Sequence, residues 1–322
     1  MDFNERPSDS YFYFQEKLKG VRFDGIAGGI QRFTEDLICH WFSNWMNHKG
    51  LRQIAFSGGV SMNVKANLEV LQRCRPDLFL VPGSGGDESL AIGACYLFAM
   101  QQGETVHPLS NRYLGTMVTD QDGIAAAKKV PQDGKYAVIG NAPDQIIAGQ
   151  LAAGKILGRC AGSMEFGARA LGNRSIIADP RRSETMRELN DKIKCRDFWM
   201  PFAPSVLEER RHAYLELPNE AADYSYMSIA ANTTPAGRDN LKAAIHPADD
   251  TARPHVVRRD QNPDYHALLS SFEKLTGIGA VLNTSLNIHG DPIVRTPDDA
   301  LHVLENTGID GMIIGKTLIL KK

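Results

Sequence analysis

The sequence has few cysteines and no long apolar run. Its five cysteines form no C-x-x-C pair and are odd in number, which is typical of reduced thiols in the cytosol and not of a disulfide scaffold. No stretch approaches the roughly 18 apolar residues of a membrane span, and the start, MDFNERPSDSYFYF, does not resemble a signal peptide. We therefore expect a cytoplasmic protein without a membrane partner.

An excess of charge of one sign is also absent. The chain carries 36 Lys and Arg against 38 Asp and Glu, for a net charge of −2, and it has no basic run of the kind that neutralises nucleic-acid phosphates. A nucleic-acid partner is therefore not expected. The nine histidines show no H-E-x-x-H or H-x-x-x-H spacing, so the sequence offers no self-contained histidine metal motif.

What the chain does have is a pattern of alternating strands and helices. Apolar residues recur every three or four positions over residues 25–48, which predicts a helix. LRQIAFSGGVSMNVKANLEVLQRC and LFLVPGSGGDESLAIGACYLFAM then each read as a strand, a glycine-rich turn and a helix. Two such units in succession predict an α/β fold with sites at the turns.

A more polar stretch at residues 101–135 suggests a domain boundary, which we place between residues 1–110 and 111–322. The second part mixes both element types. We expect helices at 141–158 (its end leading into a short strand), 183–195, 263–276 and 297–306, and strands at 279–283 and 312–320.

The two glycine turns are candidate nucleotide-binding sites. Gly58 and Gly59 in the first turn, and Gly86 in the second, permit close backbone approach to a ligand next to a helix start. Asp87 follows directly, and its carboxylate could coordinate a metal or contact a nucleotide. The alternatives are a plain structural turn and, for Asp87, a helix cap.

The stretch SMEFGARALGNRSIIADP, residues 163–180, concentrates polar groups around a short apolar turn. Arg169, Asn173, Arg174 and Ser175 follow Glu165 within eleven residues, and interspersed glycines argue against a regular helix. Arginine suits bidentate binding of phosphate or carboxylate. The structural alternative is an Arg–Glu165 ion pair that ties the loop down, but two arginines face one acid.

Another cluster of cations lies in NDKIKCRDFWMPFAPSVL, residues 190–207. If the segment is extended, Lys192, Lys194 and Arg196 share one face. A solvated edge strand would look similar, yet the segment runs into an apolar stretch. We therefore predict that these cations line a pocket.

Short polar side chains end the predicted strand in VLNTSLNIHGDPIVRTPDDAL, residues 281–301. Asn283, Thr284 and Ser285 suit recognition of a phosphate or a nucleobase, and Arg295 adds a cation before a helix that opens at Pro297. A turn alone would explain the nearby glycine and proline, but not so many hydrogen-bonding groups.

Together these motifs resemble the O-carbamoyltransferase family, which includes nodulation and antibiotic-tailoring enzymes. FSGGVSMNVKANLEVL and GSGGDESLAIGA resemble the second half of the family's first domain, an actin/sugar-kinase-like (ASKHA) fold related to tRNA threonylcarbamoyl-transfer enzymes. MEFGARALGNRSIIADPR, IKCRDFWMPFAPSVL, ARPHVV and LNTSLNIHGDPIVRTPDDAL resemble its second, YrdC-like domain. The resemblance covers nearly the whole chain from about residue 25.

The resemblance implies a two-step reaction. Carbamoyl phosphate and ATP form carbamoyl-adenylate in the YrdC-like domain, and the carbamoyl group then passes to an acceptor hydroxyl in the first domain, near a divalent metal (Mg or Fe). The residues that it implies for phosphate, nucleotide and metal binding are Lys194, Arg196, Arg169, Arg174, Asn173, Ser175, Asn283, Thr284, Ser285, Arg253, Arg295, Gly58, Gly59, Gly86 and the metal ligand Asp87. Charge neutralisation in a closed pocket is what such polyanions require.

Three departures from the family pattern bear on this expectation. The half of the first domain that carries the metal-binding histidines is not in this sequence. Ala168 stands where proline is usual, and Met200 where many members have arginine. If another polypeptide supplies the other half, we expect an exposed apolar face on residues 1–100. The alternatives are adenylate formation alone, a non-catalytic nucleotide-binding module, and threonylcarbamoyl transfer to tRNA.

Overall fold

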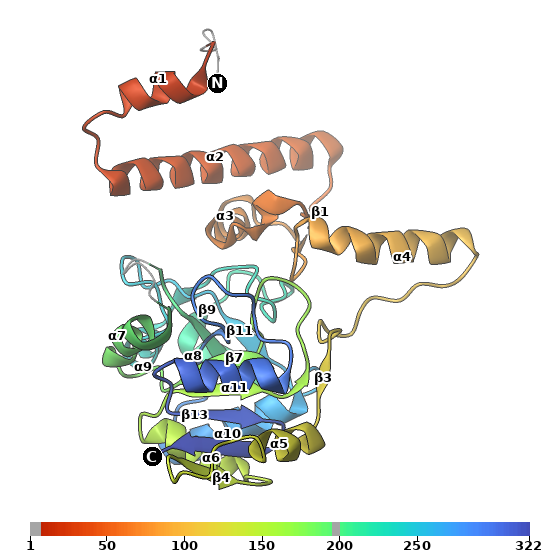
Figure 1. The fold of residues 1–322 in the computed structure, drawn as a ribbon. Coiled ribbons are helices and arrows are strands. Elements are labelled where there is room, and N and C mark those ends of the chain that lie inside the picture. Colours follow the sequence, from red (N-terminus) through yellow and green to blue (C-terminus); the bar gives the residue numbers. More distant parts are fainter. Residues whose placement is uncertain (1–7, 195–199) are drawn as a thin grey trace.

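The computed structural model describes residues 8–194 and 200–322, except the side chains of Lys192 and Lys194. It has a mixed α/β fold, as the sequence predicts, in which the N-terminal helices lie at one end of a larger part built on the main sheet (Figure 1). We call residues 8–101 the N-terminal module and residues 117–322 the C-terminal module.

The N-terminal module holds two short strands and a set of helices. Strands β1 (Gln53–Ala55) and β2 (Leu78–Leu80) pair in parallel. Each is followed by a glycine turn and helical segments, as predicted from the sequence. The helical elements are α1 (Ser10–Lys17), α2 (Phe23–Lys49), η1 (Gly59–Met62), α3 (Val64–Glu69), η2 (Val70–Cys74), η3 (Asp87–Ser89) and α4 (Leu90–Gln101).

Helix α2 is attached to the strands by one apolar face. Phe42 packs edge-on against Phe56 and Phe79, with ring centroids 5.2 and 6.3 Å apart. Ile38, Cys39 and Met46 are buried with it. The helix ends at Gly50, whose left-handed backbone is a common C-terminal stop.

The C-terminal module is built on an eight-stranded mixed sheet in the order β11-β8-β12-β7-β5-β13-β14-β4. Only the pairs β11–β8 and β13–β5 are parallel. The strands are β4 (Tyr136–Ile139), β5 (Leu157–Cys160), β7 (Arg174–Ala178), β8 (Ala203–Leu207), β11 (His255–Val257), β12 (Ala280–Ser285), β13 (Gly311–Ile314) and β14 (Thr317–Lys321).

Helices cover both faces of this sheet. Helices α6 (Asp144–Ala152) and α10 (Pro263–Thr276) contact each other and share one apolar cluster with Leu157, Ile177 and Ile313. Helices α5 (Asp120–Ala127) and α11 (Pro297–Asn306) share the other cluster with Ile176, Met312 and Ile314. Because neighbouring positions along a strand face opposite sides, both sides of the sheet are apolar.

The smaller elements complete the module around the sheet. They are β3 (Met117–Val118), β6 (Gly162–Ser163), α7 (Glu184–Leu189), η4 (Asn190–Lys194), η5 (Glu208–Arg210), α8 (Arg211–Tyr214), β9 (Leu215–Glu216), β10 (Asn232–Thr233) and α9 (Pro235–Asn240). Strand β3 pairs with β6, and β9 with β10. The predicted helix at 297–306 begins as expected, because Thr296 and Asp299 form a capping box around Pro297.

The helix predicted at 183–195 is confirmed over its described part as α7 and η4, and the extended alternative for residues 190–194 does not apply, because Leu189 and Ile193, four residues apart, are both buried. One predicted element is wrong: the single strand at 312–320 is a hairpin of β13 and β14. Within the described part of the chain, no helix combines the length and apolar character that crossing a membrane requires.

Candidate functional site

The buried carboxylate of Glu165 stabilises the loop between β6 and β7 through hydrogen bonds to its backbone. One carboxylate oxygen accepts hydrogen bonds from the backbone N–H groups of Leu171 and Asn173, each at 2.7 Å, and of Arg174 at 3.1 Å. The side chain is buried. The acid therefore closes the turn through main-chain groups.

Gly172 permits the same turn to lie against α10. Its φ is +104°, and a Cβ built there would come within 2.4 Å of the Tyr265 ring. Only glycine fits such a contact in this left-handed backbone region. The prediction that glycines break helical structure in this stretch is confirmed.

Arg174 braces the fold through main-chain carbonyls. Its side chain is fully buried. The guanidinium donates hydrogen bonds to five main-chain carbonyls, at 2.9–3.3 Å: those of Thr116, Ala161, Gly162, Asn173 and Arg295. The two terminal nitrogens of Arg174 thus face carbonyl dipoles from four chain segments, while its buried Nε has no hydrogen-bond partner among the described residues, so its role in binding an anion stays a prediction.

Asn173 and Ser175 are likewise turned into the protein. Asn173 Oδ1 accepts from Arg159 at 2.6 Å and from Asn262 at 2.9 Å. Ser175 Oγ accepts from the backbone N–H of Gly172 at 2.9 Å. Both are buried and neither lines the pocket described next, so their expected place in its wall is corrected.

Five of the predicted site residues do meet at one cavity. A pocket of about 340 Å³ lies between the loop after Gly167, the start of β8 and the end of β12. Its lining residues are Ala168, Arg169, Ala170, Met200, Pro201, Met227, Arg253, Asn283, Thr284 and Ser285. A larger cavity of about 560 Å³ beside β4 contains none of the predicted residues.

Two cationic side chains contribute to the described lining of this pocket. Arg169 and Arg253 line it, and its described lining includes no Asp or Glu. Thr284 and Ser285 add hydroxyl groups, which can donate to phosphate oxygens. The arrangement suits a ligand with several negative charges.

The side-chain nitrogen of Asn283 is held by two protein acceptors. Its nitrogen donates to the carbonyl of Ala170 at 3.0 Å and to Ser205 Oγ at 2.9 Å. Its Oδ1 is buried and has no hydrogen-bond partner among the described residues. Because the nitrogen is committed, the pocket offers the oxygen as an acceptor for an N–H donor.

Ser205 is held in turn by His255. Ser205 Oγ and His255 Nδ1 lie 2.9 Å apart, on neighbouring residues of the parallel pair β8–β11. The imidazole stacks on Tyr265, with ring centroids 5.9 Å apart and planes inclined by 12°. Burial lowers the pKa of His255 to about 3, so the ring is neutral near pH 7.

The remaining predicted cations are Lys194, Arg196 and Arg295. Arg196 and the side chain of Lys194 fall outside the described residues, so their roles stay predictions. Arg295 is exposed and is not part of the described pocket lining; its backbone N–H donates to Asp299 and its carbonyl accepts from Arg174.

The two glycine turns lie side by side. The N–H of Gly58 donates to the carbonyl of Gly85 at 2.8 Å. Gly59 and Gly86 stand at the starts of η1 and η3, and Asp87 is exposed in the first turn of η3. Among the described residues, no group of three or more His, Cys, Asp or Glu could hold a metal, so Asp87 lacks co-ligands there.

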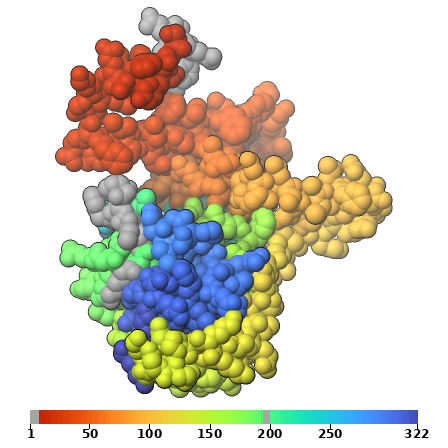
Figure 2. All heavy atoms as spheres, in the orientation of Figure 1, coloured from red at the N-terminus to blue at the C-terminus, as the bar shows by residue number. Residues whose placement is uncertain are grey.

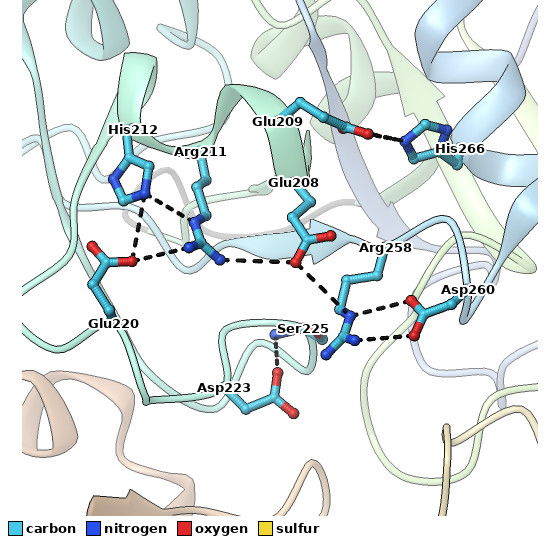
Figure 3. A network of polar contacts seen from close by, with 10 residues as sticks. All are labelled: Glu208, Glu209, Arg211, His212, Glu220, Asp223, Ser225, Arg258, Asp260 and His266. Carbon is cyan, nitrogen blue, oxygen red and sulfur yellow. Dashed lines mark hydrogen bonds and ion pairs between the residues drawn. The ribbon is translucent and has the colours of Figure 1, made fainter. Parts of the chain in front are cut away.

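A second charged cluster is a network of ion pairs and hydrogen bonds (Figure 3). Arg258 lies 3.0 Å from Asp260 and 3.9 Å from Glu208, and His266 lies 3.0 Å from Glu209. Arg211 pairs with Glu220 at 3.0 Å. These contacts join the ends of β8 and β11 and attach α10 to η5. Exposed pairs of this kind contribute little stability each.

Sequence reasoning missed Ser205, His255 and Met227. Ser205 sits inside the apolar run PFAPSVL, where a lone buried serine signals a required hydrogen bond. His255 follows Arg253 by two residues, but no spacing pattern links it to Ser205 or Asn283. Met227, which lines the pocket with a φ of +56°, carries no local signal.

The chain belongs to the carbamoyltransferase family. The family model for the carbamoyltransferase C-terminus matches residues 148–321, which hold the whole described pocket, and the model for the N-terminus matches residues 8–96.

The chain is similar to longer proteins. It is 37% identical to an uncharacterized protein of Methanocaldococcus jannaschii over 96% of its own length and 51% of that protein. It is 31% identical to the nodulation protein NolNO of Sinorhizobium fredii over 92% of its length and 44% of that protein. The chain therefore spans about half the length of these relatives.

A shorter match involves a relative whose name states an activity. The 3'-hydroxymethylcephem-O-carbamoyltransferase of Amycolatopsis lactamdurans is 34% identical over 53% of this chain and 32% of that protein. Among solved structures, full-length HypF overlaps 57% of this chain and 22% of its own at 16% identity and a TM-score of 0.37, a likeness too weak to define the domains.

Proposed function

We propose that the C-terminal module binds carbamoyl phosphate and ATP and forms carbamoyl-adenylate, and that the carbamoyl group then passes to a hydroxyl of a small-molecule acceptor. The observation that carries this proposal is that Arg169 and Arg253 line one pocket together with Thr284 and Ser285. Both substrates are polyanions, and bringing them together requires neutralising cations in a confined site.

The residues of the pocket have distinct roles in this proposal. Arg169 and Arg253 bind phosphate oxygens and offset the repulsion between the two substrates. Thr284 and Ser285 donate hydrogen bonds to the same phosphates. Asn283 Oδ1, held by Ser205, accepts from an N–H group, either the carbamoyl amide or the amino group of adenine.

In the proposed first step, carbamoyl phosphate, ATP and one water give carbamoyl-adenylate, phosphate and pyrophosphate. Water attacks the phosphorus of carbamoyl phosphate, whose bond to the carbamoyl oxygen breaks, and phosphate and carbamate result. A carbamate oxygen then forms the new bond to the α-phosphorus of ATP, and pyrophosphate leaves from that phosphorus. In the second step, the acceptor oxygen bonds to the carbamoyl carbon, AMP leaves, and the hydroxyl proton passes to solvent.

The same proposal assigns the folds and sites of the two modules. The C-terminal module is YrdC-like, and the N-terminal module is part of an actin/sugar-kinase-like domain in which transfer takes place. The adjacent turns at Gly58 and Gly86 support a nucleotide site there. A divalent metal does not fit the described residues around Asp87 alone, and none of the proposed steps depends on it.

A non-catalytic nucleotide-binding module is the second candidate. Met200 lines the pocket with an apolar side chain that is 42% exposed. An apolar wall supplies no charge to a transition state, and this favours binding without turnover.

The decisive experiment is isotope exchange between pyrophosphate and ATP, with the purified chain, carbamoyl phosphate and Mg²⁺ and without an acceptor. Exchange that depends on carbamoyl phosphate supports adenylate formation. Tight ATP binding without exchange, in a folded chain, supports the binding module.

Matched variants connect the exchange to the pocket. Arg253→Ala and Arg169→Ala should each lower it by about 10²-fold, the scale of losing one transition-state donor. Arg258→Ala, five residues along in the exposed ion-pair cluster, should leave it within about twofold. Equal activity in all three variants would contradict the assignment.

A further inference from the structure

Helix α4 is apolar on all sides and none of its 12 residues is buried. Leu90 is 70% exposed, Leu97 58% and Phe98 64%. The helix projects away from the rest of the molecule, as the ribbon and the space-filling view both show (Figures 1 and 2). A helix that is apolar all round is normally enclosed by protein, and a 12-residue helix is marginal alone in water.

Helix α2 has a second apolar face, which nothing covers in the described chain. One face packs on β1 and β2 through residues such as Phe42. The other carries Ile30, Phe33, Leu37, Trp41 and Trp45, which are between 41% and 68% exposed. These residues account for much of the apolar periodicity of three to four positions that predicts this helix from the sequence. The helix is therefore built to lie between two layers.

The sheet of the N-terminal module is also incomplete. It consists of β1 and β2 alone, paired in parallel. Parallel sheets occur with both faces covered and with several strands, and two strands are marginal by themselves. Leu80 in β2 is 49% exposed. The outer edges of β1 and β2 can each accept another strand.

We infer that the N-terminal module docks with a polypeptide equivalent to the half of its relatives that this chain does not span, which adds strands to the β1–β2 sheet and encloses α4. The relatives are about twice as long as the matched region, and the exposed elements lie largely within residues 8–96 of the N-terminus match. A second copy of this chain would present one face to α4 but could not surround it. The inference is independent of the proposed pocket chemistry.

The test co-expresses the full 322-residue chain with the unmatched half of the Methanocaldococcus jannaschii relative as a separate chain. Sedimentation velocity measures the complex, and hydrogen exchange measures protection along α4. We expect a 1:1 complex in which amides of residues 90–101 exchange at least tenfold more slowly than in the free chain. Neither readout uses a substrate, so an inactive pocket cannot mimic a negative result.

Variants assign the contact to the proposed surface. Phe98→Asp and Leu37→Asp should each weaken the complex about tenfold or more, because central apolar anchors dominate interfaces. Leu275→Asp, on α10 and 56% exposed, should leave it unchanged.

Three results would overturn the inference. The first is separate sedimentation of the two chains at micromolar concentration. The second is a homodimer that Phe98→Asp dissociates, which would make a second copy the occupant. The third is full protection of residues 90–101 in a free monomer.

Discussion

Gly167 and Ser84 touch across the two modules: a Cβ built on Gly167 would lie 2.8 Å from Cβ of Ser84. Gly167 also has a φ of +105°. It stands two residues before Arg169 of the pocket, and Ser84 belongs to the second glycine turn. The loop that bears Arg169, which we propose to bind substrate phosphate, thus packs directly against the turn that carries the proposed nucleotide site.

Gly167→Ala should therefore lower the free energy of unfolding by about 1–3 kcal/mol, because it adds both a clash and backbone strain. Chemical denaturation measures this. Gly149→Ala is the control, since that glycine lies in α6 with open space around its Cβ position; it should be neutral or slightly stabilising. Equal effects of the two changes would mean that the contact carries no strain.

Arg174→Lys should damage the fold first. A lysine cannot reproduce hydrogen bonds to five carbonyls, and we expect a loss of about 2–4 kcal/mol in unfolding free energy. Arg169→Ala should keep stability within about 1 kcal/mol while lowering pyrophosphate exchange. A stable but inactive Arg174→Lys variant would return Arg174 to the pocket.

The buried His255 should make the protein less stable in acid. Its folded pKa of about 3 lies below the ordinary value of 6.5, so below pH 6.5 the unfolded chain binds a proton that the folded chain does not. Stability from this group is present above pH 6.5. It falls by up to about 1.4 kcal/mol per pH unit toward pH 3.

Denaturation of His255→Gln between pH 4 and 7 tests this pH dependence. The variant should show a shallower loss of stability with acid than the wild type. An unchanged slope would mean that His255 titrates near its ordinary value.

Asn283→Asp should weaken binding of both anionic substrates at least tenfold, because it places a carboxylate in a pocket that now has two arginines and none in its described lining. Titration of ATP and carbamoyl phosphate by calorimetry measures the loss. Asn306→Asp, at the exposed end of α11, is the matched control. Similar affinities for both variants would separate Asn283 from the ligand.

Ser205→Ala should act through Asn283 and not through contact with substrate. Removing the hydroxyl frees the amide to rotate, so the KM for carbamoyl phosphate or ATP should rise about three- to tenfold. Ser205→Thr keeps a hydroxyl and should recover part of the loss. Identical kinetics for Ser205→Ala and the wild type would leave the serine with a packing role only.

Periodicity and glycine turns were enough to predict most elements. Both strand–turn–helix units and the α10 and α11 helices lie where the sequence places them. The alternating cations at 192–196 allowed an extended alternative to the helix predicted at 183–195, and the burial of Leu189 and Ile193 at helical spacing agrees with the helix up to residue 194.

For the pocket, residue type identified the candidate residues but not whether each side chain points into the cavity or into the protein interior. Arg169 and Arg174 are five positions apart in one motif, yet one lines the cavity and the other faces carbonyls. Only the register of β7 against β5 and β12 separates them. The link from Asn283 through Ser205 to His255 joins three strands, so no local pattern could reveal it.

The apolar cluster that begins at Ile38 in α2 continues without a break to Leu318 in β14. It passes through Leu71 and Leu215 and so crosses the boundary predicted near residue 110. The two modules are thus joined by shared packing, not by a flexible tether. Heating should melt them in one cooperative transition, and a cut between them should leave neither half able to refold alone.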